Sequence, residues 1–248
     1  MLPIGDEDTR RGLPIVNLAI IAVNILVFVL LQLPSDAFTM GFSVIPKEIT
    51  GGVDLVGPVT VALPDGTTDV LQEAPGPSPI WLTLFTSMFM HGGWTHIGGN
   101  MLFLFIFGDN VERLFGSLKY LIFYLLCGIA ADFAQIYSDP NSVIPSLGAS
   151  GAISGVLAAY VFFFPKNPIR VLLTFGYFIR IQMVPAFVMI GLWIVIQLVS
   201  GIGSIAQTAQ TGGVAYFAHI GGFAAGILLA FLLRPFLDQS GTRFAATG

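Results

Sequence analysis

Charge is scarce in this sequence: only 10% of its 248 residues are Asp, Glu, Lys or Arg, whereas a soluble globular domain carries about 25%. Hydrophobic residues make up 55% of the chain, and its mean hydropathy is +0.85. Most of the surface therefore does not face water, and we expect lipid to be the solvent. With a formal net charge of −4, the chain lacks the excess of basic residues that is typical of nucleic-acid-binding proteins.

Cysteine and metal-binding motifs are also nearly absent. The one cysteine, Cys127, lies in an apolar run, cannot form an internal disulfide, and is interpreted as a small buried hydrophobe. No His-Glu-x-x-His string, the helical zinc motif of metalloproteases, occurs. Asp109 and Asp132 are expected near opposite membrane surfaces, which argues against an aspartyl pair that shares a proton. We expect neither a metal ion nor a cofactor.

What the chain does have is a series of long apolar runs. Crossing the hydrocarbon of a bilayer takes about 20 apolar residues in a helix, and an unpaired backbone cannot cross lipid. Five runs meet that length or nearly so, and the run 150–164 is clearly shorter. The second run can extend through Val111 or be preceded by 81–90. The six predicted helices are 13–33, 94–108, 118–137, 150–164, 181–200 and 214–233.

The basic residues predict the orientation of these helices. With six spans, nine of the ten Lys and Arg residues fall on one side, which the positive-inside rule assigns to the cytoplasm, and only Lys47 falls on the other. The sequence therefore predicts an all-α membrane protein, a bundle of six transmembrane helices with cytoplasmic N and C termini. The nine residues are Arg10, Arg11, Arg113, Lys119, Lys166, Arg170, Arg180, Arg234 and Arg243.

The organisation that follows is a short cytoplasmic N-terminus (1–12), a six-helix domain (13–234) and a cytoplasmic tail (235–248). The run 13–33 is too long for a signal peptide and is interpreted as a retained anchor. The outer loop 34–79 is expected to be a structured cap with interfacial pieces such as 38–42. Residues 201–213 suit a mobile lid, and 169–177 are expected to lie along the inner membrane interface.

Polar residues inside a membrane are costly and point to function, and Ser150 and His219 stand out among them. A helix of about 15 residues spans about 22 Å of the roughly 30 Å hydrocarbon, so Ser150 is expected about 8 Å below the outer boundary. His219 is expected at the same depth, about 8 Å into the last helix. A histidine can take the proton of a serine hydroxyl near neutral pH, which activates the serine as a nucleophile.

Small-residue ridges flank both candidates. Gly151 and Gly155 form one ridge and Gly222 and Gly226 another, and such ridges let two helices approach closely. The alternative is a packing motif in which Ser150 merely bonds a carbonyl one turn back. The paired histidine favours the catalytic interpretation.

His96 and Asn100 are four residues apart and project from one helical face. Both can donate hydrogen bonds to the negative charge of a tetrahedral intermediate, and an interhelical polar contact is the alternative. His91 is expected to be structural or interfacial. Asp132 could orient His219 as a third member of a triad, but facing a water-filled cavity or pairing with an amide is favoured. Asn24 is interpreted as an interhelical bond.

The strings HGGWTH-x-x-x-N, GDNVERLFG, GASG and AHIGG, in this order, resemble the rhomboid family of intramembrane serine proteases, in its prokaryotic type. The resemblance implies a Ser150–His219 dyad, with His96, Asn100 and the Ser150 backbone N–H as the oxyanion hole. It implies transmembrane protein substrates, cut at small residues in locally unstable helices, and a place in the bacterial cytoplasmic membrane. Lateral access near the second and fifth helices is implied as well. The matching structural turn contains Gly108, Glu112, Arg113 and Gly116.

Two departures from the family pattern are visible. Many members have an aromatic residue four positions after the nucleophile that stacks on the histidine, but here that residue is Ser154. Many have a Trp-Arg pair in the first outer loop, whereas this chain has Trp81 followed by leucine. With serine at position 154, either another residue orients His219 or the base is held more loosely. A catalytically inactive rhomboid-like protein that binds membrane clients is the alternative function, and a transporter or channel would need more ionisable residues along its path.

Overall fold

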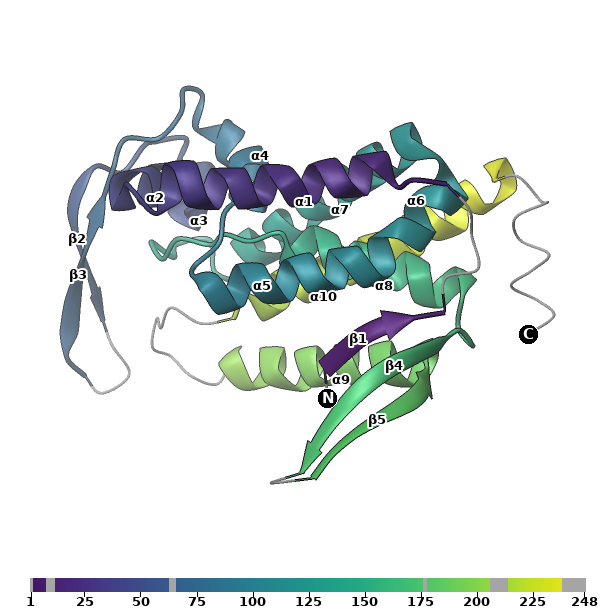
Figure 1. Cartoon of the computed structure of the whole chain (residues 1–248). Coiled ribbons are helices and arrows are strands. Elements are labelled where there is room, and N and C mark those ends of the chain that lie inside the picture. The colour runs from purple at the N-terminus through teal and green to yellow at the C-terminus, as the bar shows by residue number, and fades with distance from the viewer. Residues whose placement is uncertain (1, 8–11, 63–65, 176–177, 206–213, 238–248) are drawn as a thin grey trace.

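The computed structural model describes residues 2–7, 12–62, 66–175, 178–205 and 214–237. Apolar helices that run along one another form the bulk of the protein, with a hairpin at one end and a small sheet beside α9 (Figure 1). By length and hydropathy, three segments among the described residues can cross a membrane: Ile15–Gln32, Ser117–Ser138 and Tyr216–Phe236. Shorter apolar helices include Ser150–Phe163 and Ala186–Ile202.

Four predicted helices have bounds within a few residues of those expected. They are α1 (Ile15–Val27, continued by a π-helical turn Phe28–Gln32), α7 (Ser117–Ser138), α8 (Ser150–Phe163) and α10 (Tyr216–Leu233).

The predicted helix 94–108 is longer than expected. It comprises α5 (Trp94–Phe103), a π-helical turn (Leu104–Gly108) and α6 (Asp109–Phe115). It therefore extends through Val111, and short helical turns that include α4 (Thr83–Thr86) precede it.

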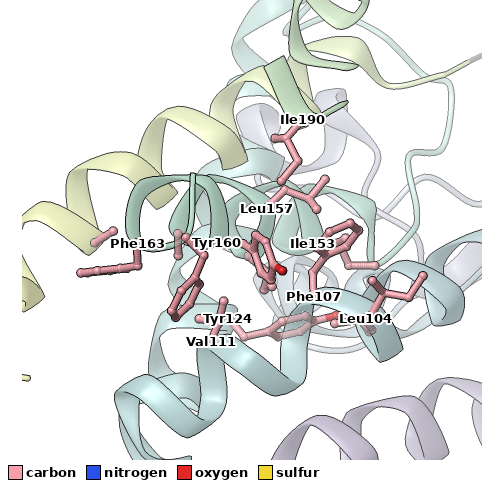
Figure 2. Close-up of a cluster of buried hydrophobic side chains, with 14 of the residues drawn as sticks. Leu104, Phe107, Val111, Tyr124, Ile153, Leu157, Tyr160, Phe163 and Ile190 are labelled. Atoms are coloured by element: carbon pink, nitrogen blue, oxygen red, sulfur yellow. The ribbon is translucent and has the colours of Figure 1, made fainter. Parts of the chain in front are cut away.

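Helix α8 is the centre of the bundle. Most of its residues are buried, which is typical of a helix that is apolar on every side. Figure 2 shows side chains of α8 packed against residues from α5–α6, α7 and α9. Cys127 of α7 is fully buried in the same core, as expected for a small hydrophobe. The labelled members are Leu104, Phe107, Val111, Tyr124, Ile153, Leu157, Tyr160, Phe163 and Ile190.

The glycine ridges bring α8 and α10 into backbone contact. A methyl group on Gly222 would collide with the carbonyl oxygen of Gly151, and one on Gly226 would lie 2.5 Å from the carbonyl oxygen of Gly155. Gly155 also faces Cys127, whose Cβ would lie 2.5 Å from an added methyl. The two helices therefore approach as closely as their backbones allow, which only residues without a side chain permit.

The turn after α6 anchors the beginning of α1. The Glu112 carboxylate accepts hydrogen bonds from the backbone N–H groups of Val16 (3.0 Å) and Asn17 (2.7 Å) and from the Ser117 hydroxyl (2.6 Å). It thus satisfies helix N–H groups that have no intrahelical partner. Gly116 ends α6 with a φ of +80°, a conformation that favours glycine.

Gly108 and Arg113 complete this contact. An added methyl on Gly108 would collide with the Asn17 side chain, which accepts a hydrogen bond from the Tyr120 hydroxyl at 2.7 Å. Arg113 donates to the carbonyl of Gly12 at 2.9 Å and pairs with Asp109 at 3.2 Å.

The prediction of an all-α protein is wrong in part, because the structure contains two small sheets. In the first, β4 (Pro168–Phe175) pairs antiparallel with both β1 (Leu2–Asp6) and β5 (Phe178–Pro185). Ile169 and Val171 are fully buried while Arg170 between them is exposed, which is the two-residue period of a strand. Residues 169–175 of the segment expected along the inner membrane interface belong to β4, and their position at the interface stays a prediction.

The sheet corrects the bounds of the fifth helix and includes part of the N-terminal segment. Helix α9 is Ala186–Ile205 rather than 181–200, because β5 continues to Pro185 and proline disfavours a helix in the residue before it. The N-terminal segment contains strand β1, and the carboxylate of Asp6 accepts hydrogen bonds from Asn110 (2.8 Å) and Tyr160 (2.6 Å).

The segment 34–79, which the sequence predicts to be the outer loop, contains regular structure in its described residues, as expected. It comprises α2 (Asp36–Phe42), α3 (Pro46–Gly51) and a hairpin of β2 (Gly57–Ala62) and β3 (Thr68–Glu73). We call this segment the outer cap. Figure 1 shows it at one end of the bundle, with α6 towards the other.

The outer cap is bonded to the loop that precedes α8. Val44 and Ser146 exchange two backbone hydrogen bonds, at 2.9 and 2.7 Å. Lys47 N–H donates to the carbonyl of Ser142 at 3.0 Å, and the Thr50 hydroxyl donates to that of Pro140 at 2.9 Å.

Two buried carboxyl groups lie within the cap. Glu48 accepts a hydrogen bond from Leu55 N–H at 2.8 Å, whereas neither carboxyl oxygen of Glu73 has a partner among the described residues. Burial raises the pKa of Glu48 to about 7, with Asp54 adding to the rise and the Leu55 bond opposing it. Burial, and then the charge of Glu48, raises the pKa of Glu73 to about 7.

Several expectations lie outside the described residues. These are the positions of Arg10, Arg11 and Arg243, the tail from 238 onward, and most of the predicted lid. Of the lid, residues 201–205 belong to the end of α9 and 206–213 are not described.

Candidate active site

Ser150 begins α8 immediately after a tight connection. Gly148 has a φ of +137°, and its N–H donates to the carbonyl of Ser87 at 2.9 Å. His219 lies in the first turn of α10. The sequence places both residues at helix starts, and the Gly151–Gly222 contact brings these two helix ends together.

The structure brings Ser150 and His219 within hydrogen-bond distance. The Ser150 Oγ lies 2.8 Å from the His219 Nε2, and the histidine is largely buried. A nucleophile and a base need a separation of about 2.6–3.2 Å for direct proton transfer. This pair can therefore generate a nucleophilic oxygen inside the bundle.

The other side of the His219 ring is held by α9. Its Nδ1 lies 2.7 Å from the Oε1 of Gln197. The ring of Trp193 lies 5.7 Å from the histidine ring at 39°. Ser154, where many family members have an aromatic residue, instead donates its hydroxyl to the carbonyl of Ser150 at 2.6 Å.

Gln197 is a site residue that the sequence interpretation missed. It is a buried polar side chain within an apolar helix. The rule that singled out Ser150 and His219, that each polar group in a membrane helix needs an explanation, applies equally to it.

His96 and Asn100 lie on the same side of α5. An added methyl on Gly148 would lie 2.9 Å from the Nε2 of His96, so this ring borders the connection to Ser150. The Nδ1 of His96 accepts a hydrogen bond from Gly92 N–H at 3.2 Å, which leaves the proton of a neutral ring on Nε2. Asn100 is buried and its Nδ2 has no partner among the described residues. His96 Nε2–H and the Asn100 Nδ2 amide can therefore each donate a hydrogen bond to a ligand.

His91 is a buried neighbour of this pair. Its ring meets that of His96 edge-on at 5.2 Å, and neither of its ring nitrogens has a partner among the described residues. Its backbone exchanges two hydrogen bonds with the Gln32 side chain, at 2.8 and 3.1 Å. These contacts are structural in kind.

Asp132 lines a small pocket next to Ser150. Its Oδ2 accepts a hydrogen bond from the Ser87 hydroxyl at 3.2 Å. The alternative in which Asp132 orients His219 is wrong, because Gln197 occupies the position next to the ring Nδ1. Among the described residues, no group of three or more His, Cys, Asp or Glu could hold a metal ion. The pocket is lined by Met88, Gly128, Asp132, Ser146, Leu147, Gly148, Ser150, Gly151, Ala152, Ala215 and Ala218.

The apolar helices define an integral membrane protein, with a partly buried serine and a buried histidine as a polar site among them. Residues 79–236 match the model of the rhomboid domain. The chain belongs to the rhomboid family.

Curated relatives come from bacteria and from a plant. The chain is 32% identical over 170 residues to "Rhomboid protease AarA" of Providencia stuartii, covering 62% of this chain and 57% of the relative. It is 31% identical over 153 residues to "Rhomboid protease GluP" of Bacillus subtilis, covering 62% and 26%. It is 28% identical over 163 residues to "Rhomboid-like protein 11, chloroplastic" of Arabidopsis thaliana, covering 65% and 56%. The chain therefore matches about half, or less, of the length of these relatives.

Proposed function

We propose that this protein is an intramembrane serine endopeptidase that cleaves transmembrane segments of other membrane proteins. Ser150 is the nucleophile and His219 the general base. The observation that carries the proposal is the 2.8 Å separation of the Ser150 Oγ and the His219 Nε2 inside an apolar bundle. Family membership and two relatives named as proteases support it.

The proposed chemistry follows from the geometry of these side chains. His219 Nε2 takes the Ser150 proton while the Oγ attacks the scissile carbonyl, and the imidazolium then gives that proton to the leaving amine. Water then attacks the resulting ester. His219 Nε2 takes a proton from that water and gives it to the Ser150 Oγ as the ester bond breaks.

The negative charge on the tetrahedral oxygen needs preorganised donors. His96 Nε2–H and Asn100 Nδ2–H supply them, together with the Ser150 backbone N–H, which lies at a helix start where N–H groups have no intrahelical partner.

For the membrane arrangement, we propose six spans with both termini in the cytoplasm. The spans are α1, the continuous α5–α6, α7, α8, α9 and α10. Burial of the short α8 inside the bundle supports a span that does not reach both lipid surfaces. The bacterial cytoplasmic membrane stays a prediction, since the relatives include bacterial and chloroplast proteins.

The test is cleavage of a model transmembrane substrate by the purified protein in liposomes. The wild type should cleave it, and Ser150→Ala should not. A serine at the exposed end of α7 provides the matched control. The Ser138 hydroxyl donates to the nearby carbonyl of Gln135, so Ser138→Ala should cleave normally. A fluorophosphonate probe should label the wild type but not Ser150→Ala. Cleavage by Ser150→Ala at the wild-type rate would overturn the serine mechanism, and no cleavage by the wild type would favour a client-binding role.

A further inference from the structure

His219 is bonded from two directions, and only one of the two bonds belongs to the nucleophile. Its Nε2 meets Ser150 on α8 at 2.8 Å, and its Nδ1 meets the Gln197 Oε1 on α9 at 2.7 Å. Both histidine and glutamine are largely buried. Each ring nitrogen of the imidazole thus contacts a side chain from a different helix.

The two contacts together select one tautomer of the neutral ring. To take the serine proton, Nε2 must offer a lone pair, so the ring proton must be on Nδ1. That N–H needs an acceptor, and the Gln197 carbonyl oxygen lies at hydrogen-bond distance from it. Without this acceptor, the buried Nδ1–H would be unsatisfied and the other tautomer would become competitive.

We propose that Gln197 is a positioning residue that fixes the tautomer and the orientation of His219. It does with a neutral amide what an aspartate does in a serine–histidine–aspartate triad. The proposal rests on the proposed function, because it gives Gln197 a role through the base and not through the substrate.

The sequence around the dyad explains why α9 has this role. The position that could carry a stacking ring on α8 is Ser154, whose hydroxyl is bonded to the Ser150 carbonyl. The ring contact to His219 that the structure describes comes from Trp193. Trp193 and Gln197 are four residues apart, so they share a face of α9. One helix face thus supplies both the aromatic contact and the acceptor.

Because Gln197 is uncharged, replacing it with glutamate should change the pH dependence of cleavage. During catalysis His219 becomes an imidazolium, and an amide stabilises that charge less than a carboxylate does. Gln197→Glu places a negative charge next to Nδ1 and favours the protonated ring. The acid limb of the pH–rate profile should therefore move to higher pH, by about 1–3 pH units for an opposite charge at this range.

The experiment compares three variants in the liposome cleavage assay. Gln197→Met keeps a side chain of similar length but removes the acceptor, so kcat should fall about 10- to 100-fold with KM nearly unchanged. Gln197→Glu should retain cleavage at high pH with the shifted acid limb. Gln135→Met is the matched control, because the Gln135 side chain accepts a hydrogen bond from the backbone N–H of Ala218 at 3.3 Å and not from the His219 ring. It should leave both kcat and the pH profile unchanged.

A second readout does not depend on cleavage. Nitrogen-15 NMR of histidine-labelled protein distinguishes the two tautomers, and His219→Ala assigns the signal among the three histidines. The wild type should show the Nδ1–H form and Gln197→Met a mixture. The proposal fails if Gln197→Met retains the wild-type kcat and tautomer, or if the pH profile of Gln197→Glu superposes on that of the wild type. If the wild type does not cleave at all, the proposed function fails, while the tautomer measurement still decides the role of Gln197.

Discussion

The backbone contact between α8 and α10 yields a quantitative prediction, through the substitution Gly222→Ala. The new methyl would collide with the Gly151 carbonyl oxygen and lie 2.9 Å from the Gly151 carbonyl carbon. These are backbone atoms of a central helix and cannot swing aside. Since a comfortable carbon–oxygen contact is about 3.3 Å or more, α8 and α10 must separate by about 1 Å.

The same separation would be felt at the dyad, because Gly151 adjoins Ser150 and Gly222 lies one turn from His219. The 2.8 Å contact between Oγ and Nε2 would lengthen to about 3.8 Å, beyond the range of a hydrogen bond. A misplacement of about 1 Å costs about 10²-fold in rate. Overpacking should also lower the free energy of unfolding by about 1–3 kcal/mol.

The assay is kcat/KM on the model substrate, with thermal unfolding measured in the same liposomes. Gly191→Ala on α9 is the matched control, because nothing lies within 4 Å of the added methyl. It should keep full activity and gain up to about 1 kcal/mol, since alanine is favoured over glycine inside a helix. If Gly222→Ala cleaves as fast as Gly191→Ala, the glycine contact does not set the distance within the dyad.

Two further predictions concern the oxyanion donors and the outer cap. Asn100→Ala should lower kcat by about 10²–10³ with little change in KM, measured by steady-state kinetics, and an equal rise in KM alone would contradict the oxyanion role. Burial raises the pKa of Glu48 and of Glu73 to about 7, above the usual glutamate value of 4.5, so between these pH values the native cap holds protons that the unfolded chain has lost. Cap stability should therefore be greatest below about pH 4.5 and decline as the pH rises through 7. Protease resistance of the cap at pH 5 and pH 8 measures this, and Glu48→Gln with Glu73→Gln should remove the difference.

The helices and the dyad follow from short-range features of the sequence. Hydropathy alone gives α7 and α10, since each is a long apolar run between polar ends. Ser150 and His219 could be paired from the sequence because both lie at helix starts, where position along the chain limits position in space. The glycine spacing adds the lateral contact, as a residue without a side chain at 151 and 222 has few uses other than close packing.

The sheet and the partner of His219 depend on contacts that no local pattern contains. Strand β1 pairs with β4, where Leu2 is opposite Leu172. The local sequence around either residue does not predict this pairing. Residues 169–175 are apolar enough to suit a membrane interface. Their alternation of buried and exposed side chains was therefore not recognised as the pattern of a strand. The sequence shows Gln197 as a polar residue in an apolar run. Whether its side chain reaches His219 depends on how α9 packs against α10.

The backbone bonds between the outer cap and the loop before α8 bear on how this protein can be shortened. The family match begins at residue 79, whereas the exchange with Ser146 comes from Val44, upstream of it. A fragment cut to the matched region would keep every side chain of the dyad and the oxyanion donors. It would leave the backbone groups of Ser146 without their partners, and unpaired backbone groups must find new ones. Trimming at the domain boundary would therefore loosen the segment that leads into Ser150, so a shortened version should begin upstream of Val44.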